Sequence, residues 1–384
     1  MRIGHYTYNI WEQGGVASYI HRLGTYQRKD GHTIYYLDSK TDINVLNTER
    51  EPPIIVRNDN DLFIQAKILK LDILHLHTAI CISSTQCIPV IRTIHGHQPY
   101  CPSGGKYLKR WSQPCDRAYS LAGCLWGHLV DRCGSIRPHN LSADFHNTWD
   151  EMRVLRDVQA IANSQFLKEQ MIHSGYADNL INVVYHPAPH LQKYVPPPQE
   201  NIPRFLFLGR IVPQKGLDWL LHSLEKVTVP VHLDIAGDGY QESEMRLLSQ
   251  RLKLTDKVTF YGWVNEAKTF QLLQSARALI FPSLWHEPAG LVSLEAAAAG
   301  RSVIASRVGG IPEYIAQQQH PLLVQPNDIE SLARKIETLA LNWSLAKQLG
   351  EEGRKMVQDR FSMKQHLEQI MQLYKLAAQP KSVV

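Results

Sequence analysis

The sequence predicts an α/β protein made of two doubly wound, Rossmann-like domains that face each other across a cleft. With 384 residues, the chain is too long for one typical core. Short apolar runs alternate with segments of helical periodicity, as in parallel sheets with crossover helices. Residues 185–203 hold six prolines and no periodicity, so we interpret them as the linker between domains at 1–190 and 200–365.

The expected elements follow from periodicity. Helical spacing predicts helices at 216–227 and 242–254, a further helix from about Gly290, and an amphipathic helix at 361–379. The helix after Gly290 would place Leu291, Leu294 and Ala298 on one buried face. The expected strands are 1–11, 71–77, 90–95, 204–209, 231–237, 258–262 and 278–283.

Composition narrows the class of protein. Hydrophobic residues at 44% and charged residues at 20% are ordinary for a soluble globular chain. A formal charge of +5 is too small to indicate nucleic-acid binding, but it suits anionic ligands or an anionic membrane surface. The chain has no run of about 18 apolar residues and no signal-peptide core, so we expect a cytoplasmic protein.

The segment "LWHEPAGLVSLEAAAAG", 284–300, carries two acids in otherwise uncharged surroundings. Glu287 precedes Pro288 and belongs to a loop, whereas Glu295 lies in the apolar helix, where a lone carboxylate needs a polar partner. The free N–H groups at the helix start form an anion site. An anion site for phosphate, flanked by two carboxylates that could accept from hydroxyls, suits a sugar nucleotide. A purely structural role for the two acids stays open.

Two further loops carry groups suited to phosphate. The loop after the expected strand 204–209 holds Arg210 and Lys215, which could neutralise a diphosphate, although cations in loops are commonly just solvated. Gly14 and Gly15 separate the first strand from the first helix, where paired glycines allow close backbone approach or form an ordinary turn. A second glycine turn, at 235–245, is equally nonspecific.

His95 ends an apolar strand and precedes Gly96. It could donate a hydrogen bond to a sugar hydroxyl or help position an acceptor, and the alternative is a satisfied core histidine.

Four cysteines fall in the loop-rich insert 97–135 and invite a metal interpretation, with His97 and His128 as further ligands. They contain no C-x-x-C pair, so we favour free thiols or local packing and predict no metal site, with zinc or another metal as the open alternative. These cysteines are Cys101, Cys115, Cys124 and Cys133.

Together the motifs resemble glycosyltransferase family 4, the retaining enzymes of the GT-B fold. The most specific match is the pair Glu287 and Glu295, separated by seven residues. "FLGRIVPQKGLDWLL", "GGVASYI" and "IANSQFLKE" also look like that family. Ala289 stands where members often have a bulky aromatic residue.

The resemblance implies roles for the matching positions. Arg210 and Lys215 would hold the donor diphosphate, together with backbone N–H groups of Gly15 and of Gly290, Leu291 and Val292. Glu295 would accept from the ribose hydroxyls, Glu287 would contact the donor sugar, and His95 would lie near sugar and acceptor. The family mechanism is front-face and uses no carboxylate nucleophile. The last helix, 366–384, would cross back to the N-terminal domain.

The predicted function is therefore a metal-independent retaining glycosyltransferase that moves a sugar from a nucleoside diphosphate sugar to a hydroxyl acceptor in polysaccharide or glycolipid synthesis. We expect no cofactor, no nucleic-acid partner and peripheral contact with the inner membrane face. Three alternatives stay open: a related epimerase or phosphorylase, a catalytically silent nucleotide-binding scaffold, and a redox or metal-sensing role for the cysteines. The donor base, sugar, acceptor and linkage stay undetermined.

Overall fold

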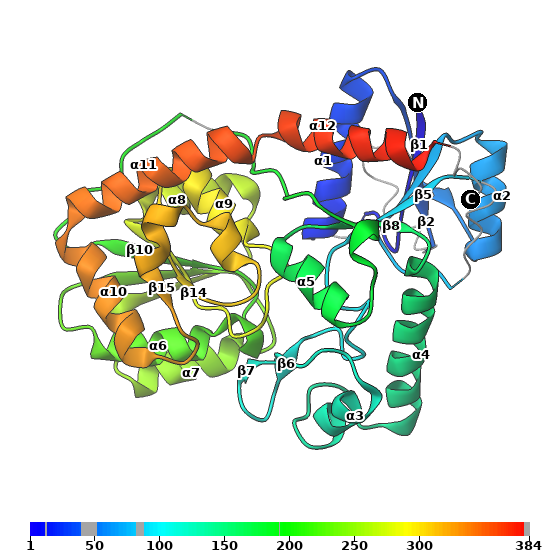
Figure 1. Cartoon of the computed structure of the whole chain (residues 1–384). Helices are drawn as coiled ribbons and strands as arrows, with labels where there is room; N and C mark the ends of the chain where they lie inside the picture. The colour runs from blue at the N-terminus through cyan, green and yellow to red at the C-terminus, as the bar shows by residue number, and fades with distance from the viewer. Residues whose placement is uncertain (12–13, 40–51, 82–87, 192, 380–384) are drawn as a thin grey trace.

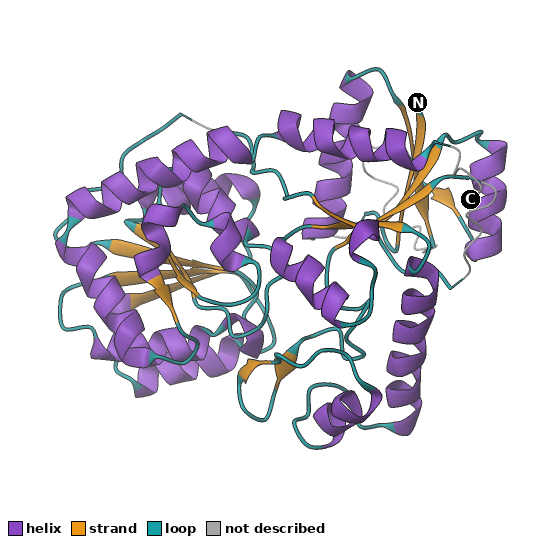
Figure 2. Ribbon diagram, viewed as in Figure 1, coloured by secondary structure: helices purple, strands orange, loops and turns teal. Residues whose placement is uncertain are grey.

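The protein is described here by a computed structural model, which covers residues 1–11, 14–39, 52–81, 88–191 and 193–379. Two all-parallel sheets, each with helices on its faces, form two domains (Figure 2). This architecture confirms the predicted fold class. The glycine turn predicted before the first helix extends into residues 12–13, which lie outside the described residues.

The N-terminal domain is built on a seven-stranded sheet with the order β3-β2-β1-β4-β5-β8-β9. Its strands are β1 Arg2–Thr7, β2 Thr33–Asp38, β3 Ile54–Ile55, β4 Ile73–Leu76, β5 Val90–Ile94, β8 Gln159–Ala162 and β9 Ile181–Val183. Its helices are α1 Gly15–Lys29, α2 Asp59–Ile68, α4 Pro138–Leu155 and α5 Gln165–His173. The central strands are buried on both faces, which explains why they appear in the sequence as continuous apolar runs.

The C-terminal domain is built on a six-stranded sheet with the order β12-β11-β10-β13-β14-β15. Its strands are β10 Arg204–Leu208, β11 His232–Ala236, β12 Val258–Gly262, β13 Ala278–Phe281, β14 Ser302–Ser306 and β15 Leu323–Val324. Its helices are α6 Leu217–Lys226, α7 Glu242–Arg251, α8 Glu266–Ser275, α9 Leu291–Ala298, α10 Ile329–Leu341 and α11 Trp343–Arg360. All seven segments expected as strands contain strands of the two sheets.

One detail of the predicted helix face is wrong. Leu294 and Ala298 of α9 are buried as expected, but Leu291 is exposed. Leu291 is the first residue of the helix, so its side chain extends past the end of the apolar core instead of into it.

The last helix, α12 (Met363–Ala377), leaves α11 and lies across the N-terminal domain (Figure 1). Its residues Ile370, Met371 and Tyr374 pack in one cluster with Ile3 and Ile20 of the N-terminal domain. A capping box at Ser362 starts the helix just after the chain crosses between the domains. The C-terminal segment therefore completes the core of the N-terminal domain.

The insert, residues 97–135, extends from the N-terminal sheet and carries little regular structure (Figure 1). It holds a short antiparallel pair, β6 (Tyr107–Leu108) and β7 (Gln113–Pro114), and one helix, α3 (Leu121–Leu129). Among the residues that the structure describes, no helix is long and apolar enough to span a membrane.

Candidate active site

The loops that follow the strands of the two sheets meet at the interdomain boundary. His97, after β5, donates from Nε2 to the carbonyl oxygen of His286, after β13, at 2.5 Å. Ser164, after β8, donates its hydroxyl to the carbonyl oxygen of Pro288 at 2.6 Å. The carboxyl edges of both sheets therefore face each other, where ligands of doubly wound domains bind.

Glu287 is held by two donors in the loop after β13. The ammonium of Lys215 lies 2.5 Å from its carboxylate, and the hydroxyl of Ser283 donates to the same oxygen at 2.8 Å. Glu287 is only 6% exposed, so the ion pair offsets the cost of burying its charge. The structure thus places Lys215 and Glu287 together, as a pair.

The loop that carries Lys215 lies close against the end of β13. Gly216 has φ +66°, and a Cβ on it would lie 2.0 Å from the carbonyl oxygen of Pro282. Only glycine allows this approach. Arg210, at the start of the same loop, is exposed, and none of the described side chains contacts its guanidinium. Arg210 is therefore the cation available to an incoming anion.

Two helices begin at the boundary without a side-chain cap. Gly14 and Gly15 at the start of α1 are exposed, and a Cβ on either would meet nothing within 4 Å. At the start of α9, the N–H groups of Gly290, Leu291 and Val292 have no hydrogen bond from the described residues. Free N–H groups at helix starts attract anions.

Glu295, on the second turn of α9, is half-buried. Burial raises the pKa of its carboxyl to about 7, and the nearby charge of Glu266 acts in the same direction. Arg22 of α1 opposes that rise across the domain boundary. Its guanidinium donates to the carbonyl oxygens of Pro187 and Ala188, in the linker. Arg22 was missed by the sequence analysis, because only the fold brings it near Glu295.

His95 is the end of a chain of hydrogen-bonded histidines inside the N-terminal domain. Gln27 Oε1 lies 2.7 Å from His5 Nε2, and His5 Nδ1 lies 3.0 Å from His77 Nε2. His77 Nδ1 lies in turn 3.0 Å from His95 Nε2. Burial lowers the pKa of His5 to about 4 and that of His95 to about 3, so all these rings are neutral at pH 7.

The amide oxygen of Gln27 sets the direction of each hydrogen bond along this row of histidines. It only accepts, so His5 donates through Nε2 and accepts through Nδ1, and the same order passes to His77 and His95. His95 then uses its Nε2 proton within the protein. No hydrogen bond joins its Nδ1 to another described residue, so with this order of protons His95 offers an acceptor at Nδ1. The predicted role, donation to a sugar hydroxyl or help in positioning an acceptor, stays a prediction.

The buried histidines do not need a metal. His5, His75 and His77 hold ligand nitrogens within 4.8 Å of one another. Yet His75 Nδ1 lies 2.6 Å from the hydroxyl of Tyr374, and its Nε2 lies 2.6 Å from the hydroxyl of Thr93. Every ring nitrogen of the three has a hydrogen-bond partner, so the cluster is satisfied as a polar core.

The insert contacts the residue just before Glu287. Asp116 accepts from Nε2 of His286 at 2.7 Å, and His97 binds the backbone of the same residue. The other ring nitrogen of His97 lies 2.5 Å from the hydroxyl of Tyr100. Both ring nitrogens of His97 therefore have hydrogen-bond partners in this arrangement, so neither is free for the metal that the open alternative placed at the insert.

Sequence comparisons cover nearly the whole chain. Residues 13–189 match Glycosyltransferase Family 4, and residues 192–356 match Glycosyl transferases group 1. An uncharacterized glycosyltransferase of Methanocaldococcus jannaschii is 27% identical over 263 residues, which are 65% of this chain and 67% of that protein. A D-inositol 3-phosphate glycosyltransferase of Streptomyces bingchenggensis is 30% identical over 215 residues, 50% of this chain and 47% of that protein. The matches thus span from about half to two thirds of these relatives.

Structural comparisons cover both domains at once. Sucrose-phosphate synthase from Thermosynechococcus elongatus superposes with a TM-score of 0.75 at 21% identity, over 98% of each chain. HepE from Anabaena in complex with UDP superposes with a TM-score of 0.72 at 16% identity, over 98% of this chain and 100% of that one.

The two facing sheets and the shared fold of these neighbours show the GT-B fold. By the family models that match its two halves, the chain belongs to glycosyltransferase family 4, and with it to the enzyme class EC 2.4.

Proposed function

We propose that the protein transfers a sugar, with retention of anomeric configuration, from a nucleoside diphosphate sugar to a hydroxyl of a growing polysaccharide or a glycolipid. The observation that carries the proposal is the exposed guanidinium of Arg210, which no hydrogen bond or ion pair joins to another described residue, at a boundary where two uncapped helices also begin. A diphosphate is the ligand that uses all three donors. Structural neighbours determined with UDP and with UDP-glucose support this ligand class.

In this proposal the diphosphate binds Arg210 and the N–H groups of Gly15 and of Gly290 to Val292. Lys215 keeps its bond to Glu287 and still has two ammonium protons for a phosphate oxygen. As negative charge builds on the leaving diphosphate, these donors strengthen their bonds and lower the barrier.

The carboxylates receive the hydroxyls. Glu295 accepts hydrogen bonds from the ribose hydroxyls. Its raised pKa in the free protein fits a carboxylate that lacks hydrogen-bond donors until the ribose binds. Glu287, fixed by Lys215 and Ser283, accepts from the donor sugar. His95 accepts a hydrogen bond from a hydroxyl group through Nδ1, which helps orient the sugar or the acceptor. The acceptor oxygen attacks on the face from which the diphosphate leaves, and a phosphate oxygen takes its proton.

A donor panel tests this function first. UDP, GDP, ADP and their sugar conjugates are screened by thermal shift against the wild type and Glu295→Ala. Ligand at 100 times its dissociation constant adds about 2.7 kcal/mol, a visible shift. One nucleotide family should stabilise the wild type and stabilise the variant less. Product NMR then reads the anomeric configuration. Products formed without an acceptor would instead indicate an epimerase or phosphorylase, and no shift at all would favour a silent scaffold.

Peripheral contact with an anionic membrane is part of the proposal. The helix α3 exposes three large apolar side chains, Leu121, Trp126 and Leu129. Exposed bases of the same insert surround one hollow of its surface: Lys109, Arg110 and Arg132. Apolar residues beside bases suit insertion among anionic headgroups, where a lipid-linked acceptor at the inner face of the membrane would be found.

Vesicle sedimentation tests the membrane contact. The wild type should bind phosphatidylglycerol vesicles and leave phosphatidylcholine vesicles unbound, and Trp126→Ser should lose most of the binding. Trp263→Ser is the matched control, because Trp263 is similarly exposed, at 61% against 58%, but lies in the C-terminal domain. Equal loss in both variants would contradict a docking role for α3.

A further inference from the structure

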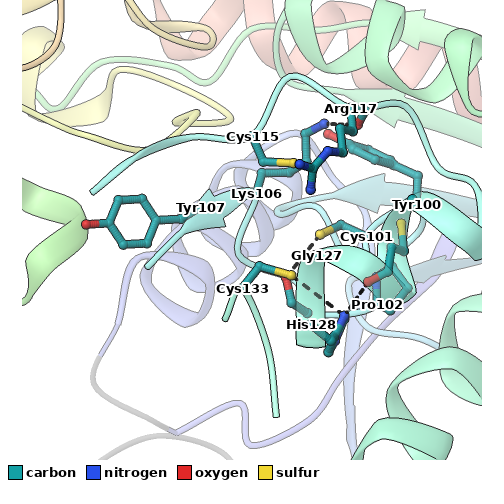
Figure 3. Close-up of a pocket in the computed structure, with 13 residues that line it drawn as sticks. Tyr100, Cys101, Pro102, Lys106, Tyr107, Cys115, Arg117, Gly127, His128 and Cys133 are labelled. Atoms are coloured by element: carbon teal, nitrogen blue, oxygen red, sulfur yellow. Dashed lines mark hydrogen bonds between the residues drawn. The ribbon is translucent and has the colours of Figure 1, made fainter. Parts of the chain in front are cut away.

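Four cysteines of the insert line one hollow that is partly open to solvent. They come from separate turns of the chain and form no disulfide. Figure 3 shows the sulfurs of Cys101, Cys115 and Cys133 turned toward the same space. Cys124, on α3, lines it as the fourth. The fold thus gathers thiols that the sequence spreads over 33 positions, from 101 to 133.

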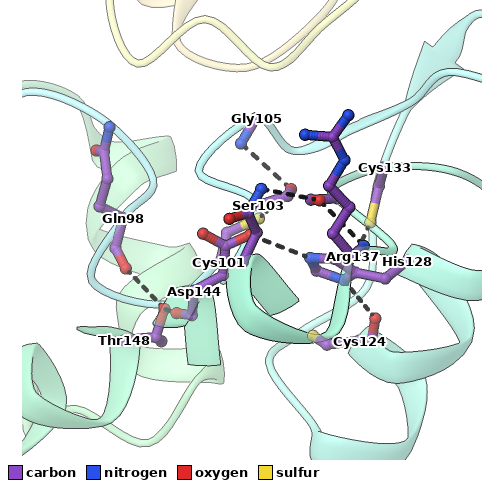
Figure 4. A network of polar contacts seen from close by, with 12 residues as sticks. Gln98, Cys101, Ser103, Gly105, Cys124, His128, Cys133, Arg137, Asp144 and Thr148 are labelled. Atoms are coloured by element: carbon purple, nitrogen blue, oxygen red, sulfur yellow. Dashed lines mark hydrogen bonds and ion pairs between the residues drawn. The ribbon is translucent and has the colours of Figure 1, made fainter. Parts of the chain in front are cut away.

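Local hydrogen bonds fix these cysteines in place. The Cys101 N–H donates to the carbonyl oxygen of His97 at 2.8 Å, and the Cys115 N–H donates to that of Lys106 at 2.9 Å. His128 Nδ1 lies 2.8 Å from the carbonyl oxygen of Cys124 and 3.6 Å from the sulfur of Cys133 (Figure 4). The buried His128 therefore ties two of the four cysteines together.

The insert has little apolar interior that would otherwise explain its order. Of the large apolar side chains between 97 and 135, only Tyr100, Tyr107 and Leu108 are buried, whereas Leu121, Trp126 and Leu129 of α3 are exposed. Tyr107 lines the edge of the cysteine hollow but packs into the core of the C-terminal domain. Segments this short, without a core of their own, commonly rely on a disulfide or a metal.

A buried cation at the hollow points to negative charge there. Lys106 is 2% exposed, yet its ammonium binds only the carbonyl oxygen of Arg117, at 2.6 Å, and lies over the ring of Tyr100. No described carboxylate lies within ion-pair distance of it. A buried lysine normally needs an anionic partner, and Lys106 lines the same hollow as the four cysteines, whose metal-bound thiolates would supply one.

We propose that Cys101, Cys115, Cys124 and Cys133 bind a metal centre through four thiolates, and that this centre is an iron–sulfur cluster. Sulfurs on one tetrahedral zinc ion lie about 3.8 Å apart. Within the described chain, only His5, His75 and His77 form a group of three or more ligands all within 4.8 Å of one another. No three of the described cysteine sulfurs therefore all lie within 4.8 Å of one another, a wider spacing than the ligands of one zinc ion have, and a four-iron cluster takes one thiolate at each of its separate corners.

The centre would serve to position the insert. The β6–β7 turn reaches the C-terminal domain, where Asn327 donates to the carbonyl oxygen of Ser112 at 2.9 Å. Asp116, next to Cys115, holds the ring of His286 beside Glu287. A cluster at the base of this segment would fix both contacts, without taking part in sugar transfer.

The first test measures metal and does not depend on the proposed function. The full chain is purified anaerobically, reconstituted with iron and sulfide, and analysed for iron, zinc, sulfide and visible absorption. We expect about four irons per chain with the broad absorption of a cluster. About one zinc and no iron would overturn the cluster, and less than about a tenth of an equivalent of either metal would overturn the site.

Variants locate the centre. Cys124→Ser and Cys133→Ser should each lose most of the iron, whereas Cys81→Ser, which removes an exposed thiol outside the insert, should keep it. Because the serine variants could misfold, cluster removal by chelator from the folded wild type provides a second measurement. Limited proteolysis should then cut within 97–135 and leave the C-terminal domain intact. Iron retained in both cysteine variants, or unchanged proteolysis after its removal, would overturn the assignment.

Discussion

The two domains share a fold but hold their polar side chains in opposite ways. The C-terminal domain keeps charges at the ends of its strands, with Arg210 exposed and Lys215 paired to Glu287. The N-terminal domain instead buries neutral histidines in its core and presents His95 at their end. A diphosphate needs charge, whereas a sugar or acceptor hydroxyl needs an oriented neutral partner. The difference indicates which substrate each side handles.

Acid should first destabilise the N-terminal domain, where the neutral histidines are buried. The pKa of His5 and that of His366 are lowered to about 4 by burial, below the unfolded value of 6.5. Their contribution is complete above pH 6.5 and is lost as pH falls toward 4, since the unfolded chain then binds more protons. One such histidine corresponds to about 3 kcal/mol. Urea unfolding at pH 7.5 and pH 5 checks this, and equal unfolding free energies would contradict it.

Removing the free cation should disable the charged side. Arg210→Ala should lower kcat/KM by on the order of 3 kcal/mol, roughly two powers of ten, with the thermal midpoint unchanged because the side chain is exposed. Steady-state kinetics measure this. Arg251→Ala, which removes an exposed arginine of α7, is the matched control. A full rate in Arg210→Ala would exclude Arg210 from the diphosphate site.

A third substitution tests a contact between the two domains. Glu313 accepts from the N–H groups of Gln165 and Phe166 at 2.7 and 2.8 Å, at the start of α5 across the boundary. Glu313→Ala should weaken this contact by about 1 to 2 kcal/mol, because it removes a helix cap together with its charge. Hydrogen exchange of those two amides should speed up about tenfold. Glu330→Ala, in the first turn of α10, should leave them unchanged.

The smallest effect concerns Glu295. The pKa of Glu295 is about 7 in the folded protein, above the usual 4.5. The free energy of unfolding therefore falls as pH rises from 4.5 through 7, because the carboxyl must then ionise in its partly buried site. A rise from 4.5 to about 7 corresponds to about 3 kcal/mol in a dry site, but Glu295 is only half-buried and solvent screens its charge, so Glu295→Gln should stabilise the free protein by about 1 kcal/mol at pH 8 and change little at pH 5. It should also weaken donor binding. Thermal shifts at both pH values, with and without donor, measure the two effects, and a variant no more stable at pH 8 would contradict the assigned pKa.

The parts that could be predicted are those set by local chemistry. Buried parallel strands such as β13 are apolar throughout, and the glutamate pair and glycine turns lie within short segments. The histidine chain could not be predicted, because residues 5, 77 and 95 become neighbours only when β1, β4 and β5 pair. Arg22 was hidden for the same reason, and so was the convergence of the cysteines.

The route of α12 also constrains how the protein is made. Tyr374 supplies the hydroxyl beside His75, and Ile370 fills the core formed by the first strands. These residues follow the other described elements in chain order, so they leave the ribosome after them. The domain translated first must therefore keep an unfilled groove until α12 has been made.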